Sequence, residues 1–492
     1  MAEEKDMSTT HAEDGHAMNK VNRLGSASIP ELILEFSIPA IFGMVVNGAY
    51  ALIDSVFLGH GVGEIGLSAL TVAAPTMSIL LGFAVLIGSG GNALCAIRLG
   101  EGKKAEAENI LGNTVMLSLL VSLVLAVIVH IPVCMDFILA ASNATPEVLP
   151  YAETFIKVIS VGCVFQILGM ALNNFIRTCG APNRALSTML VGAVACTVFN
   201  AWFVLVLDWG VAGSALATVL GQAVSCVAVV WYFVKTPNVP LRIRRVYLPL
   251  KAKLVRSICV MGMPSFIVQI SSAACQLAVN YVLVKYGSLD PIGAEAALAS
   301  VGVVQRMGNF VVLPLVGVSI AIQPILGFNY GAHLWSRVRS TLNYGIAIAV
   351  AMGLVMWIIV MVFAPQIVGF FGIKEQWMVD FTSFVLRVDL IILPTIGLHV
   401  VGSNYFQATG QPVKSIALSL ARQVGYLIPM YFILPEVIPH LIPALDALDG
   451  VYFAPPVADF LAAITVIVFI TIEMLHLRRR EHEEATESQE GK

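Results

Sequence analysis

Charged side chains are scarce in this sequence of 492 residues. Asp, Glu, Lys and Arg make up 12% of the chain and hydrophobic residues 58%, whereas soluble domains carry about 25% charged and about 45–50% apolar residues. A soluble fold of this size could not remove so much apolar surface from water, which argues against soluble enzymes. The net charge of −3 provides no basic surface for a nucleic acid. We expect an all-α polytopic membrane protein.

Paired cysteines and nucleotide-binding motifs are also missing. None of the eight cysteines forms a CxxC pair, so we expect reduced, buried side chains rather than a zinc site or disulfides. No GxxxxGKS or GxxxxGKT sequence is present, which excludes ATP-driven export by this chain. An integral-membrane enzyme would need clustered histidines or acids, whereas His60, His130, His333 and His440 are scattered. We therefore expect neither enzyme activity nor a cofactor.

The two ends of the sequence are polar. Residues 1–30 carry mixed charges, and no apolar stretch of a secretory signal precedes Pro30. Residues 477–492 are similarly rich in charged side chains. We interpret both segments as disordered cytoplasmic tails.

Long stretches without charged residues mark the expected membrane helices. A helix needs about 20 residues to cross the apolar core of a bilayer. Ten stretches are of about this length or longer, and two more contain one charge each, Arg422 and Asp459. The twelve predicted spans are 36–53, 65–97, 109–135, 158–176, 185–207, 209–234, 257–284, 307–336, 340–373, 390–413, 415–434 and 451–474.

The basic residues fall mostly on one side of these spans. Most of the 28 lysines and arginines lie in the two tails, the central linker or the loops after spans 2, 4 and 8, as Lys103, Arg244 and Arg337 do. Only Lys285 and Lys374 fall on the opposite side. The positive-inside rule makes the basic side cytoplasmic. We predict a multi-pass protein of the plasma (inner) membrane with both termini in the cytoplasm.

The two halves of the chain resemble each other. FIRTCGAP (175–182) stands at the end of the fourth span and FQATGQP (406–412) at the end of the tenth, while Gly100 and Gly331 stand near the ends of the second and eighth. Six spans per half predict two lobes related by an axis along the membrane normal, with a substrate cleft between them. The predicted parts are an N-lobe (31–234), a cytoplasmic linker (235–256) and a C-lobe (257–476).

Several motifs are similar to those of the multidrug and toxin extrusion (MATE) family. QPILGFNYGA (323–332) resembles its QPxxGxNYGA segment, and FQATGQP resembles its FQAxGxP segment. RQVGYLIP (422–429) resembles RQVxxxIP. The segments 450–461 and 211–218 resemble GVWxAxPxxD and GxxGAAxAT. The motifs occur in order and at matching spacing, and the resemblance covers roughly residues 30–475.

This resemblance implies a twelve-helix, two-lobed antiporter. Such a protein expels amphipathic, often cationic, compounds by alternating access, in exchange for inward flow of H+ or Na+. The alternative is a lipid-linked saccharide flippase of the same superfamily, which usually carries more cationic residues in its central cleft. We expect small-molecule substrates and the lipid bilayer as partners, no nucleic acid, and a monomer.

Asp54 is the strongest candidate for binding the coupling ion. It lies late in the first span, in YALIDSVFLG (50–59), where burying a charge costs at least about 2.5–3.5 kcal/mol. Its carboxylate can take up a proton or Na+ on one side and release it on the other. The alternative is a helix-end aspartate that is hydrated at the outer mouth. The family's first-helix aspartate has the same D-x-x-x-x-G context.

A carboxylate that binds an ion also needs neutral oxygen partners. The resemblance to the DinF-like branch of the family implies Asn173, Asn174, Asn200 and Thr218, each of which can instead simply join helices. Val204 stands where that branch often has a second aspartate, and Ser272 stands where another branch has a glutamate. A single carboxylate favours a proton, although amide and hydroxyl oxygens can still complete a sodium site at Asp54.

Further ionisable residues lie within the second half. Asp389 can bind a cationic substrate or pair with Arg306 or Arg387. His399 can titrate near neutral pH or be simply hydrogen-bonded. Arg422 and Asp459 each lie about eight residues in from opposite ends of their spans, which puts them at similar depth in a core of about 30 Å. We predict that these two form a structural ion pair.

The substrate cavity is expected to be mostly apolar, with methionine and aromatic surfaces that repack around varied ligands. Such side chains in membrane helices also often face lipid or the protein core. Besides Asp389 and His399, the predicted lining is Met44, Gln166, Met170, Phe175, Gln269, Gln276 and Asn280.

Overall fold

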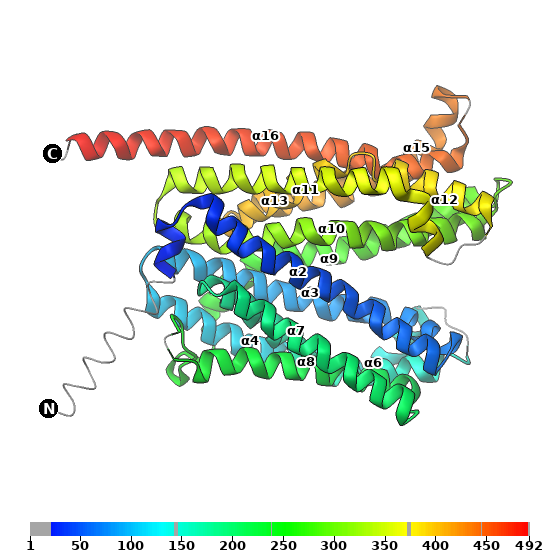
Figure 1. The fold of residues 1–492 in the computed structure, drawn as a ribbon, viewed down its shortest axis with the longest axis horizontal. Coiled ribbons are helices and arrows are strands. Elements are labelled where there is room, and N and C mark those ends of the chain that lie inside the picture. Colours follow the sequence, from blue (N-terminus) through cyan, green and yellow to red (C-terminus); the bar gives the residue numbers. More distant parts are fainter. Residues whose placement is uncertain (1–20, 142–145, 238, 371–374, 444, 491–492) are drawn as a thin grey trace.

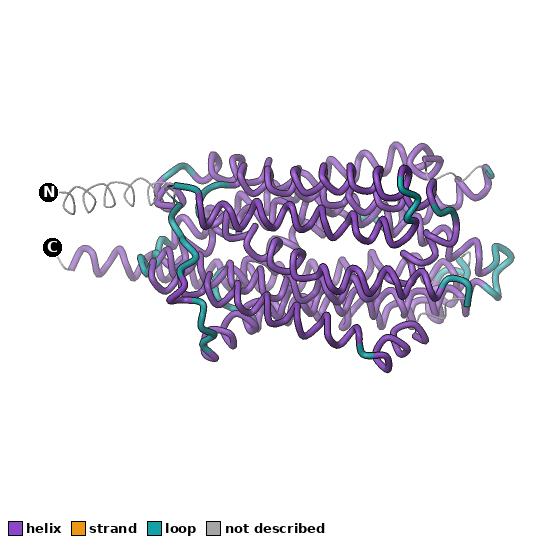
Figure 2. The backbone as a smooth tube through the Cα atoms, turned by 90° about the horizontal axis from the view of Figure 1, so that it is seen from below, coloured by secondary structure: helices purple, strands orange, loops and turns teal. Residues whose placement is uncertain are grey.

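The computed structural model describes residues 21–490, apart from 142–145, 238, 371–374 and 444. In this part of the chain all regular elements are helices (Figure 2). Within these described residues, eleven helices are long and apolar enough to cross a membrane. The number is twelve if α12 (Gln376–Asp389) and α13 (Leu393–Ala408), which are bent by 43° relative to each other, count as one broken span. The all-α polytopic architecture expected from the apolar runs is confirmed.

The first half of the chain forms six spans. They are α2 (Ile29–Gly61), α3 (Glu64–Gly100), α4 (Lys104–His130), α6 (Leu149–Thr178), α7 (Pro182–Asn200) continued by the π-helix η1 (Ala201–Val206), and α8 (Gly210–Lys235). A short helix, α5 (Pro132–Ala141), follows α4. The predicted third span ran through this break, which lies at Pro132, a residue with no backbone N–H to continue the helix.

The second half begins after a linker that contains the short helix η2 (Arg245–Tyr247). Besides α12 and α13, its helices are α9 (Ala252–Gly287), α10 (Ala294–Gly331), α11 (Trp335–Phe370), α14 (Pro412–Leu420), continued by the π-helix η3 (Ala421–Leu427) and α15 (Ile428–Leu441), and α16 (Ala447–Glu490). The tenth span starts earlier than predicted, with the 14 residues of α12. The charges of Asp380, Arg387 and Asp389 hid this helix from a search for uncharged runs.

The helices lie side by side along the long axis of the molecule in two groups (Figure 1). One group contains α2 to α8, the N-lobe, and the other contains α9 to α16, the C-lobe. The start of α2 and the end of α16 lie at the same end of the bundle (Figure 1). We call it the basic end, because the segments that carry Lys103, Arg184 and Arg244 lie there.

Glycines bring the two lobes into backbone contact. α3 of the N-lobe packs against α9 and α10, and α2 packs against α10. A Cβ atom at Gly100, the last residue of α3, would lie 2.0 Å from the Phe328 carbonyl oxygen of α10. A Cβ at Gly331, the last residue of α10, would lie 2.1 Å from the Ile97 carbonyl oxygen of α3. The two contacts mirror each other, as a two-fold axis between the lobes requires.

A second close contact, between α3 and α9, lies deeper in the interface. A Cβ at Gly90 of α3 would lie 2.1 Å from the Ile258 carbonyl oxygen, and a Cβ at Gly262 of α9 would lie 1.8 Å from the Leu86 carbonyl oxygen. We refer to Gly90, Gly100, Gly262 and Gly331 as the glycine seam. No side chain fits at these positions, so the lobes are closely apposed along the basic half of the interface.

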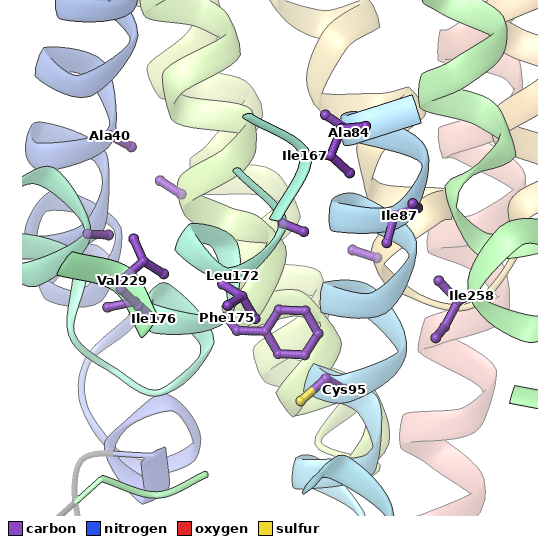
Figure 3. Close-up of a cluster of buried hydrophobic side chains, with 14 of the residues drawn as sticks. Ala40, Ala84, Ile87, Cys95, Ile167, Leu172, Phe175, Ile176, Val229 and Ile258 are labelled. Atoms are coloured by element: carbon purple, nitrogen blue, oxygen red, sulfur yellow. The ribbon is translucent and has the colours of Figure 1, made fainter. Parts of the chain in front are cut away.

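Apolar side chains fill the space between helices of the N-lobe. Phe175 and Leu172 of α6 lie near Ile87 and Cys95 of α3, and Val229 of α8 joins the same cluster (Figure 3). The ring of Phe175 would come within 3.1 Å of a Cβ at Gly91. All eight cysteines are free, and six of them are buried.

The predicted N-terminal tail contains structure near the basic end. Residues 21–26 are helical, and Val21 and Leu24 are buried. Arg337 of α11 donates hydrogen bonds to the carbonyl oxygens of Leu24 at 3.0 Å and Ala27 at 2.7 Å. The prediction of a tail over 1–30 is therefore wrong from residue 21 onward, because apolar side chains and backbone carbonyls there find partners on the C-lobe. Residues 1–20 lie outside the described part.

The predicted C-terminal tail is also partly helical. α16 runs on to Glu490, and Arg480 donates a hydrogen bond to the hydroxyl of Tyr330 at 3.3 Å. Arg339 pairs with Glu481 at 2.9 Å. The prediction of a disordered tail over 477–492 is thus wrong up to Glu490, since charged helix-forming residues extend the last span. Residues 491–492 are not described.

The linker between the lobes is attached to α4. The buried carboxylate of Glu108 pairs with Arg244 at 2.8 Å and accepts a hydrogen bond from the backbone N–H of Arg242 at 3.3 Å. Asn113 Oδ1 accepts a hydrogen bond from the backbone N–H of Lys251 at 2.8 Å. The predicted linker therefore lies against the N-lobe and joins α9 at Ala252.

Candidate functional site

A buried carboxylate lies where three helices of the N-lobe meet. Asp54, in the part of α2 far from the basic end, is 5% exposed. Asn200 Nδ2 of α7 donates a hydrogen bond to its Oδ1 at 2.6 Å, and Thr218 Oγ1 of α8 donates one to its Oδ2 at 2.9 Å. Cys196 Sγ contacts Oδ1 at 3.7 Å. The structure thus brings together Asp54, Asn200 and Thr218, three of the predicted ion-coupling residues.

The local structure of α7 explains this convergence. Cys196 and Asn200 are four residues apart and share one helix face, and Asn200 Nδ2 lies 3.2 Å from Cys196 Sγ. The π-helix η1 begins directly after Asn200, and π-helical turns often occur at functional sites. Val204 stands where the DinF-like branch often has a second aspartate. It packs against the end of α2, where a Cβ at Gly61 would lie 2.4 Å from its side chain.

The partners of Asp54 are neutral, which suits a group that exchanges an ion. In the described part of the chain no basic side chain lies within ion-pair distance of this carboxylate. Asn200 Oδ1 is buried and has no hydrogen-bond partner. Hard cations prefer oxygen ligands, and a protonated carboxyl group needs an acceptor for its O–H. Asn200 Oδ1, after rotation of the amide, can serve in either role.

Asn173 and Asn174 lie elsewhere. Asn173 Nδ2 donates hydrogen bonds to the Ala185 carbonyl oxygen and to Thr188 Oγ1, both at 2.9 Å. Asn174 Oδ1 accepts a hydrogen bond from Arg177 at 2.8 Å. Asn173 therefore joins α6 to α7, whereas the hydrogen bond of Asn174 stays within α6. The structure does not place either of them at Asp54. Their position late in α6 puts them nearer the basic end than Asp54 is.

The C-lobe contains a buried ion pair. Arg422 Nε in η3 donates to Asp459 Oδ1 in α16 at 2.6 Å, and the two side chains are 24% and 6% exposed. The structure thus brings together Arg422 and Asp459, which the sequence predicts to pair because they lie at similar depth in the membrane. η3 follows α14 as η1 follows α7, so each lobe places a π-helical turn beside a buried carboxylate.

Asp389 ends α12, at the bend between α12 and α13. Neither predicted arginine pairs with it, because Arg387 Nε donates to the Met361 carbonyl oxygen at 3.1 Å and Arg306 is exposed. Residues two apart on a helix do not face each other, which explains why the side chain of Arg387 does not reach Asp389. Asp389 instead interacts electrostatically with the Arg422–Asp459 pair.

The predicted cavity residues lie in different surroundings. Phe175 is wrongly predicted as lining, because it is 0% exposed and belongs to the N-lobe core (Figure 3). His399 is 9% exposed, and its Nδ1 has no hydrogen-bond partner. Gln276 and Asn280 are exposed on α9 and joined by a hydrogen bond of 3.1 Å. The half-buried candidates are Met44, Gln166, Met170 and Gln269.

Sequence reasoning missed two features of this region. Cys196 could have been found from its spacing, since it lies one helical turn before Asn200. The ring pair Phe83–Phe266, whose centroids lie 5.1 Å apart between α3 and α9, had no signal in the sequence. Its partners are far apart in the chain, and aromatic residues are common in membrane helices.

Most of the chain is similar to known multidrug exporters. The family model MatE matches residues 39–202 and 264–433, one segment in each lobe. The multidrug export protein MepA of Staphylococcus haemolyticus is 25% identical over 456 residues, which cover 92% of this chain and 95% of that protein. MepA of Staphylococcus aureus strain N315 is 24% identical over 438 residues, covering 89% and 92% of the two chains.

Solved structures show the same fold. The MATE multidrug transporter DinF-BH, solved as a complex with a ligand, has a TM-score of 0.80 and 30% identity, with 91% of this chain and 96% of that chain covered. An outward-facing MATE family transporter of the MOP superfamily has a TM-score of 0.84 at 23% identity, with 92% and 98% covered. The two-lobed arrangement in Figure 1 is therefore shared with these proteins.

Proposed function

This chain belongs to the MatE family, and from that membership we propose that it is a secondary antiporter that exports amphipathic, cationic drugs or metabolites in exchange for H+ or Na+. Its relatives named above are multidrug exporters. The observation that carries the antiport mechanism is the Asp54 carboxylate, which is buried in the N-lobe among neutral partners. It can gain or lose an ion without breaking an ion pair.

Antiport requires that the ion and the substrate act on one shared equilibrium between two states of the lobes. Binding of a proton or Na+ at Asp54 changes its hydrogen bonds to Asn200 and Thr218 and so the packing of α2 on α7 and α8. α2 also packs against α10 of the C-lobe, where a Cβ at Gly317 would lie 2.8 Å from Ile41 Cα. α2 is therefore the element that would carry the effect of the ion from Asp54 to the lobe interface.

The glycine seam supports a transport cycle with alternating access. Its close contacts fit a state in which the basic end of the interface is closed. Transport then needs a second state in which the seam has separated and the substrate enters from the basic end. With both ends of the chain in the cytoplasm, as the basic loops predict, that opening would face the cytoplasm.

The experiment that tests this proposal is export of a fluorescent cation from liposomes that contain the purified protein. A pH gradient alone and a sodium gradient alone separate the two coupling ions. Wild-type protein should drive export under at least one of them. No export under either gradient would overturn the proposed antiport.

The Asp54→Asn variant tests the site itself. It keeps the shape of the side chain but fixes its charge at zero, so gradient-driven export should fall to near background. Dye binding in detergent should survive, because the contacts of an amphipathic compound are spread over apolar surface. Asp136→Asn, a change at an exposed aspartate of α5, is the matched control and should export normally. If Asp54→Asn exports at the normal rate, Asp389 or His399 becomes the next residue to test.

A further inference from the structure

The segment 235–256, which links the two lobes, is strongly basic. It contains basic residues at seven positions and no acidic residue, and all seven basic side chains are exposed. They are Lys235, Arg242, Arg244, Arg245, Lys251, Lys253 and Arg256. Within the described residues, Arg244 is the only one of them that pairs with a carboxylate, that of Glu108 at 2.8 Å. The other exposed cations have no acidic partner in this part of the chain.

The contacts of this linker with α4 determine its depth along the bundle. Asn113 Nδ2 donates a hydrogen bond to the Tyr247 carbonyl oxygen at 3.3 Å, and a Cβ at Gly112 would lie 2.4 Å from the same oxygen. Gly112 lies about 12 Å along α4 from its first residue, Lys104. After Glu108, α4 contains no Asp, Glu, Lys or Arg. The linker therefore lies beside the start of the apolar part of α4, at the level where headgroups meet the apolar core of a bilayer.

The apolar side chains of the linker point in two directions. Ile243 and Leu248 are partly buried and pack against the hydrophobic core. Val246 is 80% exposed and Leu250 is 40% exposed, and both lie among the basic side chains. Such apolar surface is unfavourable in water. It fits the boundary between headgroups and acyl chains, where segments with apolar and basic side chains bind to membranes.

The start of α9 adds to the need for an anion. Lys251, Lys253 and Arg256 surround this start, and the first turn of α9 contains no acidic residue. The N-terminal end of a helix carries a partial positive charge, so these cations repel it. The positive-inside rule accounts for basic residues on this side of the membrane, but not for their attachment at the level of the headgroups. An anion from outside the chain would offset the repulsion.

We propose that the linker binds the headgroups of anionic phospholipids in the leaflet at the basic end, with Val246 and Leu250 at the boundary of the acyl chains. Lipid phosphates supply the negative charge that Arg242, Arg245 and Arg256 lack, and a guanidinium can bind two phosphate oxygens at once. Bound lipid would attach the chain connection between the lobes to the membrane surface. This inference requires a membrane-embedded fold and does not depend on the proposed antiport.

Binding of lipid to the purified protein tests this inference. We would titrate the protein in detergent with phosphatidylglycerol or with phosphatidylcholine and follow the bound lipids by native mass spectrometry. Wild-type protein should bind phosphatidylglycerol more tightly. Each basic residue beside an anionic membrane contributes about fivefold in affinity. The combined change Arg242→Gln, Arg245→Gln and Arg256→Gln should therefore weaken binding of phosphatidylglycerol by at least about tenfold and leave phosphatidylcholine unaffected.

A matched variant controls for net charge. Arg184→Gln, Arg478→Gln and Arg479→Gln together remove three exposed arginines from the same end of the bundle but outside the linker. This variant should keep the preference for phosphatidylglycerol. An equal loss in the two triple variants would reveal a general effect of charge and would overturn the inference. Equal affinity of the wild-type protein for the two lipids would overturn it as well.

A spin label at Val246 tests the depth of the linker without any change to its basic residues. On a background without native cysteines, Val246→Cys would carry the label in bilayers of three parts phosphatidylcholine and one part phosphatidylglycerol. The label should be reached less by a water-soluble nickel complex and more by oxygen than a label at Glu483→Cys, an exposed position in the charged end of α16. Equal access of the nickel complex to both labels would place the linker in water and contradict the inference.

Discussion

Asp54 and Asp459 are both buried carboxylates, but their surroundings differ. Asp54 accepts hydrogen bonds from an amide and a hydroxyl, whereas Asp459 faces the guanidinium of Arg422 at 2.6 Å. A group with neutral partners can change its charge and keep its neighbours. A group in an ion pair leaves a buried cation behind if its own charge is lost. This contrast supports ion exchange at Asp54 and a structural role for Asp459.

The ion pair should be visible in the free energy of unfolding. Either Arg422→Gln or Asp459→Asn leaves one buried charge without its partner, which should cost about 3–5 kcal/mol. The double variant removes both charges and should recover part of the loss. Thermal unfolding of the four proteins in detergent measures this coupling. If the double variant is as unstable as the sum of the two single variants, the residues do not interact.

Sequence information located the Asp54 site only in part. Asp54 stood out because a charge in an apolar run demands a reason, and the family pattern pointed to Asn200 and Thr218. Asn173 and Asn174 shared the same residue type and a similar setting, yet they face α7 and Arg177. Each residue along a helix turns by about 100°, so the partner of a polar side chain depends on helix rotation, which the sequence does not specify.

At the scale of elements, the number of spans was easier to predict than their boundaries. Uncharged runs located most helices, because the bilayer core excludes charge. They failed at α12, where Arg387 is satisfied by the Met361 carbonyl oxygen inside the protein. The π-helices η1 and η3 also escaped prediction, since an inserted residue changes helix winding without changing composition.

The glycine seam allows a prediction about helix packing. A side chain at Gly331 would meet the Ile97 carbonyl oxygen, so Gly331→Ala should separate α10 from α3 and favour the state that is open at the basic end. Spin labels at the exposed positions Lys103 and Ser336 would report a longer distance between the lobes. Gly302→Ala is the matched control. Gly302 lies in the same helix, α10, but a Cβ there meets nothing within 4 Å. Unchanged distances in Gly331→Ala would contradict a role of the seam in closure.

At the scale of the whole molecule, the paired loops and glycines predicted two related lobes. The mirrored contacts of Gly100 and Gly331 agree with that prediction at the level of single carbonyl groups. The sequence could not indicate which end of the interface is closed, because one sequence must support both states of a transporter. Only the spatial arrangement of α3, α9 and α10 reveals the closed end.

The orientation in the membrane remains a prediction that labelling can test. On a background without native cysteines, Lys103→Cys and Arg244→Cys should react with an impermeant maleimide only from inside the cell. Leu289→Cys, in the loop between α9 and α10 where this side chain is 78% exposed, should react only from outside. Basic loops stay in the cytoplasm during insertion, which is the reason for this expectation. Reversed reactivity at any two of the three positions would contradict it.

The contacts across the lobe interface have a further consequence. Within the described residues, no ion pair joins one lobe to the other. Glycine backbone contacts, amide or hydroxyl groups such as Asn92 and Gln323, and hydrogen bonds from Arg337 to backbone carbonyls connect them. Dissolved salt screens interactions between charges but has little effect on close packing or on buried hydrogen bonds between neutral groups. The opening and closing of the basic end should therefore be insensitive to ionic strength.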